Sequence, residues 1–280
     1  MPISSVNSWR NTAAANHDGL RMGLDQIQVE KLRSALTAGK EELFQLVLEQ
    51  DPAVLLNLLK NAHLTDQHLL VLLRRRDLSE ELIKQIARHE RVKTTHKLKL
   101  ALVGNGNAPA SITLSLLPHL YLFELLNLCI LPGSTPDQRL AAERQIIQRL
   151  STIELGQKLT LARRGTGKIL EALLKQGEPQ VLTAALDNPH LKEVAILTFL
   201  RSGRPTAATI SQVARHARWG RRHSLRLAML KHRLTPSIWF TLWLPARKNF
   251  ELNNLLVCRQ LGAGQIELVR RELHKRRGRF

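Results

Sequence analysis

The feature that most constrains this chain of 280 residues is an internal repeat, in which position 83 corresponds to position 210 and the neighbouring positions follow at the same offset. The segment Ile210–Met229 reads ISQVARHARWGRRHSLRLAM, and Ile83–Leu102 reads IKQIARHERVKTTHKLKLAL, with ten of the twenty positions identical. Breaks on either side keep this repeat offset, as Asn61 does with Asn188. Self-similarity at a fixed period is typical of repeat architectures. The sequence therefore predicts two homologous halves.

Each half reads as a series of short helices. Aromatic residues make up only 4% of a leucine-rich chain, and this composition favours helix over strand. Apolar stretches of about 8–14 residues alternate with Pro, Gly and Asn breaks, and no period-two alternation persists. Helices this short cannot bury an apolar face alone, but stacked in a row they share a continuous core. We therefore predict an all-α fold, a right-handed α-solenoid of short helices made of two homologous halves.

Two equivalent stretches carry a family resemblance: LKLALVGNGNAPASITLSLLP ending at Pro118, and LRLAMLKHRLTPSIWFTLWLP ending at Pro245. They resemble bacterial HEAT/armadillo-like α-solenoids, and most of all the leucine-rich variant repeats. The resemblance covers residues 50–260 and implies a binding surface rather than a reaction. The cysteine cluster that holds iron and sulfur beside some variant-repeat proteins is absent here, so we expect no cofactor.

The predicted organisation has three parts. Residues 1–26 are polar and small, and we expect a disordered N-terminal tail. The first helical-repeat half then covers residues 27–150 and the second, strongly basic half covers residues 151–280. Ser79 and Thr206 precede equivalent apolar stretches and are predicted helix N-caps. The last helix of each half, Asp137–Leu150 and Gln265–Arg277, is expected to slip in register by a residue or two.

One segment, residues 112–131, is long and apolar enough to be a candidate membrane-spanning helix. Its counterpart at the repeat offset carries Arg247, Lys248 and Glu251, so we expect no membrane insertion but two short buried helices split at Pro118. Only two cysteines are present, Cys129 and Cys258. They offer no disulfide framework, and they indicate a reducing, cytoplasmic location.

Candidate chemistry is sparse. Gly165-Thr166-Gly167-Lys168 lacks the first glycine and the final Ser/Thr of a phosphate loop, and a helix–helix turn explains it. Histidines seven apart, His89 with His96 and His216 with His223, have neither helical ligand spacing nor a nearby carboxylate or thiol, so no metal is expected. We expect them to cap neighbouring turns. No nucleophile signature occurs, so we predict a non-catalytic protein.

The positive charge is the informative feature. The formal net charge is +19; residues 151–280 hold 24 Lys and Arg against 8 Asp and Glu, whereas residues 1–150 hold 18 against 15. Between residues 215 and 233, the basic segment, no acidic residue occurs. Thr94 and Thr95 stand in the first half where Arg221 and Arg222 stand in the second, so the fold does not require these arginines. The candidate nucleic-acid or anion-binding residues are Arg215, Arg218, Trp219, Arg221, Arg222, Arg226, Lys231 and Arg233.

The basic segment has a functional and a structural interpretation. On a continuous helix, Arg222, Arg226 and Arg233 would lie within roughly 40° of one another, and Trp219 beside them could stack a base. Such a surface would bind a polyanion, with nucleic acid the expected ligand. Alternatively, the arginines form a solvated face with Trp219 in the core, or the chain is a protein-interaction scaffold for an acidic partner. The sequence predicts no oligomeric state.

Overall fold

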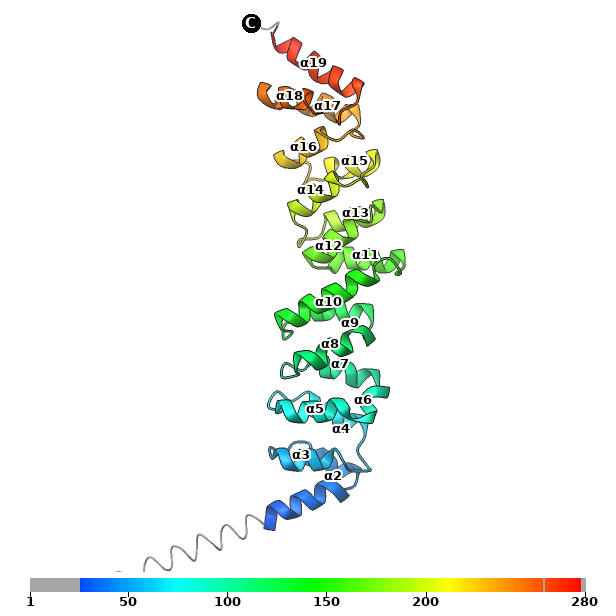
Figure 1. Cartoon of the computed structure of the whole chain (residues 1–280), viewed down its shortest axis with the longest axis vertical. Helices are drawn as coiled ribbons and strands as arrows, with labels where there is room; N and C mark the ends of the chain where they lie inside the picture. Colours follow the sequence, from blue (N-terminus) through cyan, green and yellow to red (C-terminus); the bar gives the residue numbers. More distant parts are fainter. Residues whose placement is uncertain (1–25, 259, 278–280) are drawn as a thin grey trace, which may run out of the picture. The chain divides into compact units, whose positions relative to one another are not determined.

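The computed structural model describes residues 26–258 and 260–277, and every regular element in these ranges is helical (Figure 1). The all-α prediction is confirmed. The predicted N-terminal tail lies outside the described residues except for Gln26, where a helix over residues 26–37 begins.

The chain divides into two compact units. The first runs to Glu124 and includes Leu131–Ala141; the second consists of Leu125–Ile130 and the chain from Ala142. Besides helix 26–37, the first unit contains α2 (Lys40–Leu46), α3 (Pro52–Leu58), α4 (Asp66–Leu73), α5 (Glu80–Arg88), α6 (Glu90–Thr94), α7 (His96–Gly104), α8 (Ala110–Leu116) and the 3₁₀ turn η1 (Leu117–His119). The division passes through α9 (Leu122–Ile130) and α10 (Pro136–Arg149). The second unit contains α11 (Leu155–Arg164), α12 (Gly167–Leu174), α13 (Pro179–Leu186), α14 (Glu193–Arg201), α15 (Ala207–Arg215), α16 (His223–Leu230), α17 (Ser237–Trp243), η2 (Leu244–Ala246), α18 (Asn249–Leu256) and α19 (Ala263–Arg277).

Helix boundaries recur at the repeat offset. Helices α5 and α15 begin and end at equivalent positions, as do α8 and α17. Helix α10 begins at Pro136 and α19 at the equivalent Ala263, so the last helix of each half starts in register and the slip expected there is absent. The interval after α5 differs, because the first unit forms α6 there and the second forms a turn around Gly220.

Side chains and prolines set the helix starts as the sequence indicates. The Ser79 hydroxyl accepts a 3.3 Å hydrogen bond from the backbone N–H of Leu82, and Thr206 accepts one of 3.2 Å from Thr209. Both N-cap predictions are confirmed. Pro52 and Pro179 are the first residues of α3 and α13, where a missing N–H costs nothing and the fixed φ suits a helix.

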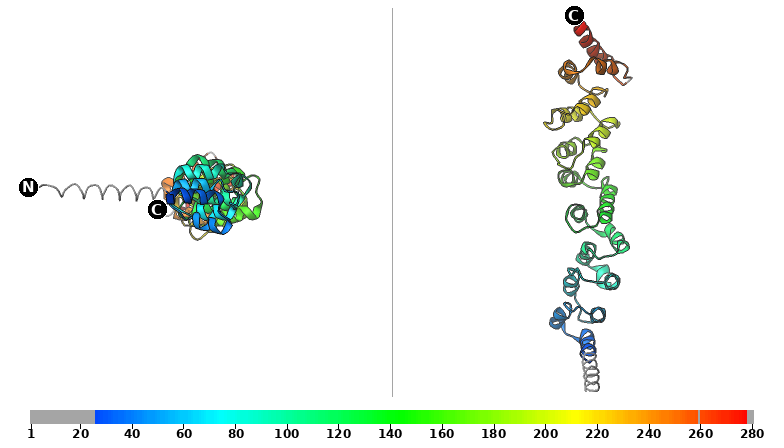
Figure 2. Two further views of the ribbon diagram at one scale, coloured as in Figure 1. Left: turned by 90° about the horizontal axis from the view of Figure 1, so that it is seen from below. Right: turned by 90° about the vertical axis from the view of Figure 1, so that its left-hand side faces the viewer.

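In the second unit, helices α11 to α14 each pack on the helix two positions further along the chain. Helix α11 contacts α13 and α13 contacts α15, while α12 contacts α14 and α14 contacts α16; Figure 2 shows these helices from two further directions. Buried residues occupy one pattern in three of them: Ile169, Leu170, Leu173 and Leu174 in α12; Val181, Leu182, Ala185 and Leu186 in α13; Ala195, Ile196, Phe199 and Leu200 in α14. Positions 0, 1, 4 and 5 share one helix face, and this face forms the core.

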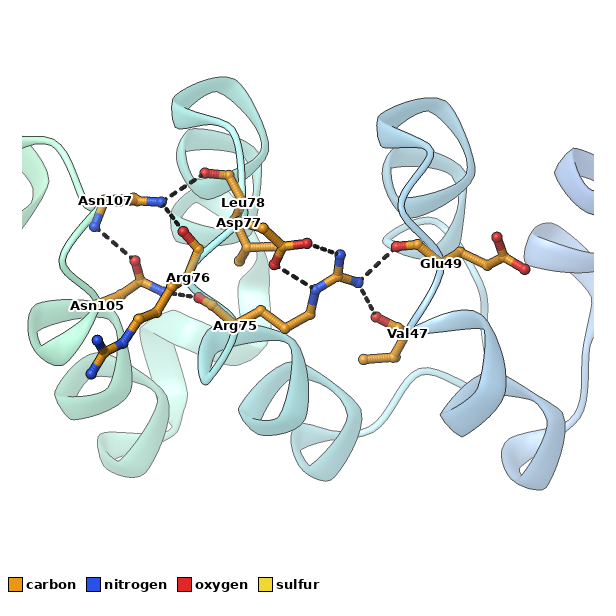
Figure 3. Close-up of polar contacts among 8 residues, drawn as sticks. All are labelled: Val47, Glu49, Arg75, Arg76, Asp77, Leu78, Asn105 and Asn107. Carbon is orange, nitrogen blue, oxygen red and sulfur yellow. Dashed lines mark hydrogen bonds and ion pairs between the residues drawn. The ribbon is translucent and has the colours of Figure 1, made fainter.

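Buried polar side chains tie the end of one helix to an earlier helix of the same unit (Figure 3). The amide of Asn105 donates to the carbonyl oxygens of Leu73 and Arg75, at 2.8 and 2.9 Å. One step earlier, the Arg75 guanidinium donates to those of Val47 and Glu49, at 2.5 and 2.7 Å. Helix C-termini leave carbonyls without intrahelical partners, and these side chains satisfy them.

A side-chain amide also donates to carbonyl oxygens at the end of an earlier helix at equivalent positions of the two units. Asn61 and Asn188 are both buried, and the sequence identified them only as helix breaks. Their amides donate to equivalent carbonyls, Asn61 to Ala35 and Ala38 at 3.0 and 3.2 Å, Asn188 to Ala162 and Gly165 at 2.9 and 3.3 Å.

The apolar segment 112–131 is interrupted at Pro118 as predicted, but the expectation that both helices are buried is wrong for α8, in which only Thr113 is buried. Helix α8 ends at Leu116, η1 contains Pro118, and α9 starts at Leu122. None of the helices in the described ranges combines the length and apolar character needed to cross a bilayer. Cys129 and Cys258 carry thiols.

Candidate polyanion-binding surface

Most basic side chains of the basic segment lack an ion pair with a described carboxylate. Of the seven Lys and Arg residues between 215 and 233, only Arg222 forms one, 3.9 Å from Glu193. Ion pairs occur in both units. The first unit has Lys31–Glu49, Arg75–Asp77, Lys84–Glu80, Arg91–Asp66 and Lys93–Glu90. In the second unit, the other described pairs between Lys or Arg and a carboxylate lie outside the basic segment: Lys158–Glu178, Lys168–Glu143, Lys175–Glu171 and Arg276–Glu272. The second unit therefore presents positive charge that its own described carboxylates leave unneutralised.

Trp219 is a core residue. Its side chain is 2% exposed, and its indole N–H donates a 2.8 Å hydrogen bond to the carbonyl oxygen of Leu186 at the end of α13. The Arg218 guanidinium lies 4.2 Å from the centre of its ring. The expectation that Trp219 stacks a base is therefore wrong, because no base can reach a ring that the core and Arg218 cover.

The basic segment is not one helix. Arg215 is the exposed last residue of α15, Arg221 is exposed in the following turn, and Arg222 is the N-cap of α16. Helix α16 ends at Leu230, so Arg233 lies in the turn between α16 and α17. The predicted alignment of Arg222, Arg226 and Arg233 on a continuous helix is wrong, because the chain turns on both sides of α16.

Arg218 and Arg222 line a small hollow of about 490 Å³. Lys192 and Glu193, at the start of α14, also line it. The Arg218 guanidinium donates two long hydrogen bonds, 3.5 Å each, to the carbonyl oxygens of Asn188 and Leu191, in the loop between α13 and α14. Glu193 lies beside Arg222, so this lining holds three cations, Lys192, Arg218 and Arg222, and one carboxylate.

Arg226 is half-buried in α16 and turned toward its own unit. Its Nε–H donates a 2.5 Å hydrogen bond to the carbonyl oxygen of Gly220, and its guanidinium lies 5.5 Å from the ring centre of Trp243. Burial, and then the nearby charges of Arg247 and Arg221, lower the pKa of Arg226 from its ordinary value.

Lys231 and Arg233 line a larger groove of about 1130 Å³, the Arg201 groove. It lies along the C-terminal ends of α14 and α16 and includes Cys258, which follows α18. Its described lining holds Arg201, Lys231, Arg233 and His232 and no carboxylate. Burial, followed by the charge of Arg233, lowers the pKa of His232, so this imidazole is largely uncharged at neutral pH.

Sequence reasoning missed Arg201, which ends α14 and lies far from Lys231 in the chain. Only the contact of α14 with α16 brings them to one groove. Helices two positions apart in the chain pack on each other here. Comparing the residues at the ends of such helices could have placed Arg201 beside Lys231. A basic residue at the last helical turn also interacts favourably with the helix dipole.

The repeated histidines have structural partners. Nδ1 of His89 accepts a 3.2 Å hydrogen bond from the N–H of Arg91, and Nδ1 of His216 accepts the same from Arg218. The prediction that the histidines cap turns is confirmed for His89 and His216 and is wrong for His96 and His223. His96 and His223 each pair with a carboxylate of a later helix: Nε2 of His96 lies 2.8 Å from Glu124, and that of His223 lies 2.9 Å from Glu251.

These carboxylates correct the expectation that none lies near His96 and His223, since the folded chain supplies them from α9 and α18. Among the residues that the structure describes, no group of three or more His, Cys, Asp and Glu side chains could hold a metal ion.

The chain matches no protein-family model, and no curated protein or solved structure is detectably similar to it.

Proposed function

We propose that the second unit is a non-catalytic binding scaffold that binds a polyanion, nucleic acid above all, through the Arg201 groove. The observation that carries the proposal is the lining of this groove. Arg201, Lys231 and Arg233 are exposed, form no ion pair with a described carboxylate, and converge on a hollow whose described lining has no acidic group. Such a hollow attracts anions over a longer range than an isolated cation.

Phosphate contacts fit these side chains better than base contacts do. Arginine presents planar N–H groups that match phosphate oxygens, and lysine supplies a mobile point charge. The Ser202 and Ser224 hydroxyls in the same lining already donate to the Phe199 carbonyl oxygen and to Glu193, so the three cations supply the phosphate contacts. Because Trp219 is buried, the basic segment offers no stacking platform, so binding through phosphates predicts little sequence preference.

The scaffold in this proposal is an α-solenoid of two homologous halves, of the HEAT/armadillo or leucine-rich variant type. Three observations support it: the recurring helix boundaries, the packing of α12 on α14 and α14 on α16, and the equivalent amides of Asn61 and Asn188. The division into halves at residue 150 remains a prediction. Two cysteine thiols support the proposed cytoplasmic location.

One observation favours an acidic protein as the second candidate. Leu234, Ile238 and Leu242 are exposed to 42, 57 and 58% beside Arg233. Exposed apolar side chains next to unpaired cations are typical of protein interfaces, which combine apolar contacts with a polar rim.

The test is binding of fluorescently labelled duplex DNA, single-stranded DNA and RNA to the full chain and to R201Q/K231Q/R233Q, over a range of salt concentrations. The control is K60Q/R74Q/R76Q, which removes one lysine and two arginines from exposed positions of the first unit. We expect the groove variant to lose affinity for all three ligands, and its log K against log salt to flatten by about 0.9 per lost phosphate contact on duplex DNA.

The control separates a specific groove from net charge. If both triple variants bind equally well, the affinity comes from overall charge and the groove is not the site. If none of the nucleic acids binds the native chain but an acidic, leucine-containing peptide does, and the groove variant loses it, the protein-partner candidate replaces nucleic acid.

A further inference from the structure

A second cationic feature lies near the N-terminal ends of α16 and α18. Arg247 follows η2, just before α18, and its side chain is 7% exposed. One terminal N–H donates a 2.6 Å hydrogen bond to Nδ1 of His223. Its Nε–H has no hydrogen-bond partner, and no described carboxylate forms an ion pair with it. A buried guanidinium with so few partners is unfavourable unless something else compensates its charge.

The first unit shows that this position does not need a cation. The equivalent of Arg247 is Leu120, which is 2% exposed. The histidine–glutamate pair beside it is present in both units, as His96 with Glu124 and as His223 with Glu251. Leucine therefore suits the same backbone position and leaves no charge to compensate.

Arg247 is also not needed to satisfy the end of η2, because another side chain does that. The Arg276 guanidinium donates to the carbonyl oxygens of Leu244, Pro245 and Arg247, at 2.9, 3.0 and 2.7 Å. The side chain of Arg247 is therefore not needed as a hydrogen-bond donor to the carbonyl oxygens at the end of η2.

Two further arginines concentrate charge at the same place. Arg226 donates to the carbonyl oxygen of Gly220, the residue before Arg221, and Arg247 donates to His223, which lies one helical turn before Arg226. Burial, and then the charges of Arg247 and Arg221, lower the pKa of Arg226. In the first unit, Thr94 and Lys99 occupy the positions of Arg221 and Arg226. The hydrogen bond from the Lys248 N–H, at 3.0 Å, and then the charges of His223 and Arg247 lower the pKa of the nearby Glu251 carboxylate. Glu251 therefore attracts Arg247, but this single carboxylate is shared with His223.

We propose that Arg221, Arg226 and Arg247, the arginine cluster, bind a phosphate group. Exposed Arg221 and half-buried Arg226 supply the N–H groups that contact its oxygens, and the buried charge of Arg247 strengthens the attraction. A dianionic phosphate relieves the mutual repulsion of three guanidinium groups that form no ion pair with a described carboxylate. The cluster does not rest on the proposed groove, since the two share no residue.

The test compares the thermal melting of the native chain and R247L in inorganic phosphate against chloride at equal ionic strength. We expect phosphate to raise the native Tm in a saturable way. R247L, which restores the residue of the first unit, should melt at a higher temperature than the native chain without phosphate, because a buried charge is gone. It should bind phosphate at least roughly tenfold more weakly, since one charge-assisted interaction contributes that much.

Two further variants keep the result decisive. R221T introduces the residue of the first unit at an exposed position and should weaken phosphate binding without changing the Tm in chloride. R164Q removes an exposed cation of the second unit outside both proposed sites and should leave both values unchanged. If R247L melts below the native chain and its phosphate-dependent shift is intact, Arg247 is a structural residue and the proposal fails.

The source of the phosphate is resolved by comparing ligands. Equal affinity for inorganic phosphate and for a nucleoside 5′-monophosphate assigns the cluster to a free phosphate group. If an oligonucleotide binds the native chain more tightly than inorganic phosphate and the nucleoside 5′-monophosphate do, and R247L binds all three equally, the cluster is assigned to the nucleic-acid backbone. Because R201Q/K231Q/R233Q leaves the cluster intact, failure of the groove and failure of the cluster are distinguishable.

Discussion

The indole N–H of Trp219 donates to the carbonyl oxygen of Leu186, at the end of an earlier helix, across a distance of 2.8 Å. This bond fixes the turn between α15 and α16 against the C-terminal end of α13. The turn carries Arg218, Arg221 and Arg222, so the buried tryptophan determines where three of the candidate arginines emerge. In the proposed binding surface, this tryptophan positions the arginines, and its buried ring is not available to a ligand.

Trp219→Phe should therefore destabilise the second unit. The substitution keeps an aromatic ring but removes the donor to Leu186, and an unsatisfied buried carbonyl costs about 1–3 kcal/mol. Urea unfolding followed by circular dichroism measures the loss. Trp239→Phe serves as a control in a half-buried position with a single hydroxyl partner, Ser211. Equal stability of W219F and the native chain would contradict the assigned role of the indole.

Asn188→Ala and Asn61→Ala should each be destabilising by a similar amount. Either substitution leaves two carbonyl oxygens at a helix end without their amide donor, which costs about 1–3 kcal/mol or more. Asn254→Ala, at an exposed position, is the matched control and should change stability by less than about 0.5 kcal/mol. A large difference between N61A and N188A would show that the two amides are not equivalent.

The sequence predicts the helices of this fold better than the environment of its candidate binding residues, for a physical reason. Helix starts depend on local chemistry, and Ser79 and Thr206 are readable without the fold. The environment of Trp219 depends on α13, and the grouping of Arg201 with Lys231 depends on the packing of α14 on α16. Projecting Arg222 to Arg233 onto one helix failed because nothing in the angular periodicity reveals that the chain turns after Leu230.

Gly220→Ala should disturb the turn that presents the arginines. A Cβ atom at Gly220 would lie 2.0 Å from the carbonyl oxygen of Ala214 and 3.0 Å from that of His216. Backbone atoms cannot move aside as a flexible side chain can, so we expect destabilisation of about 1–3 kcal/mol. Gly203→Ala is the control, because its added Cβ would meet nothing within 4 Å. Thermal melting that places G220A level with G203A would rule out this close approach.

The last prediction concerns Arg221→Thr/Arg222→Thr, the pair of residues that the first unit has as Thr94 and Thr95. The Thr95 hydroxyl donates 2.8 Å to a carboxylate oxygen of Asp66, and Glu193 is the equivalent acceptor in the second unit, so the fold should accept both threonines. We expect an unchanged Tm in chloride and weaker nucleic-acid binding across sequences. The salt dependence should flatten by about 0.9 per lost phosphate contact on duplex DNA.

K168Q/K175Q removes two charges from the same unit and should have a smaller effect. Normal melting with unchanged affinity and unchanged salt slope would mean that these arginines form only a solvated face, and an acidic protein would then be the better candidate partner.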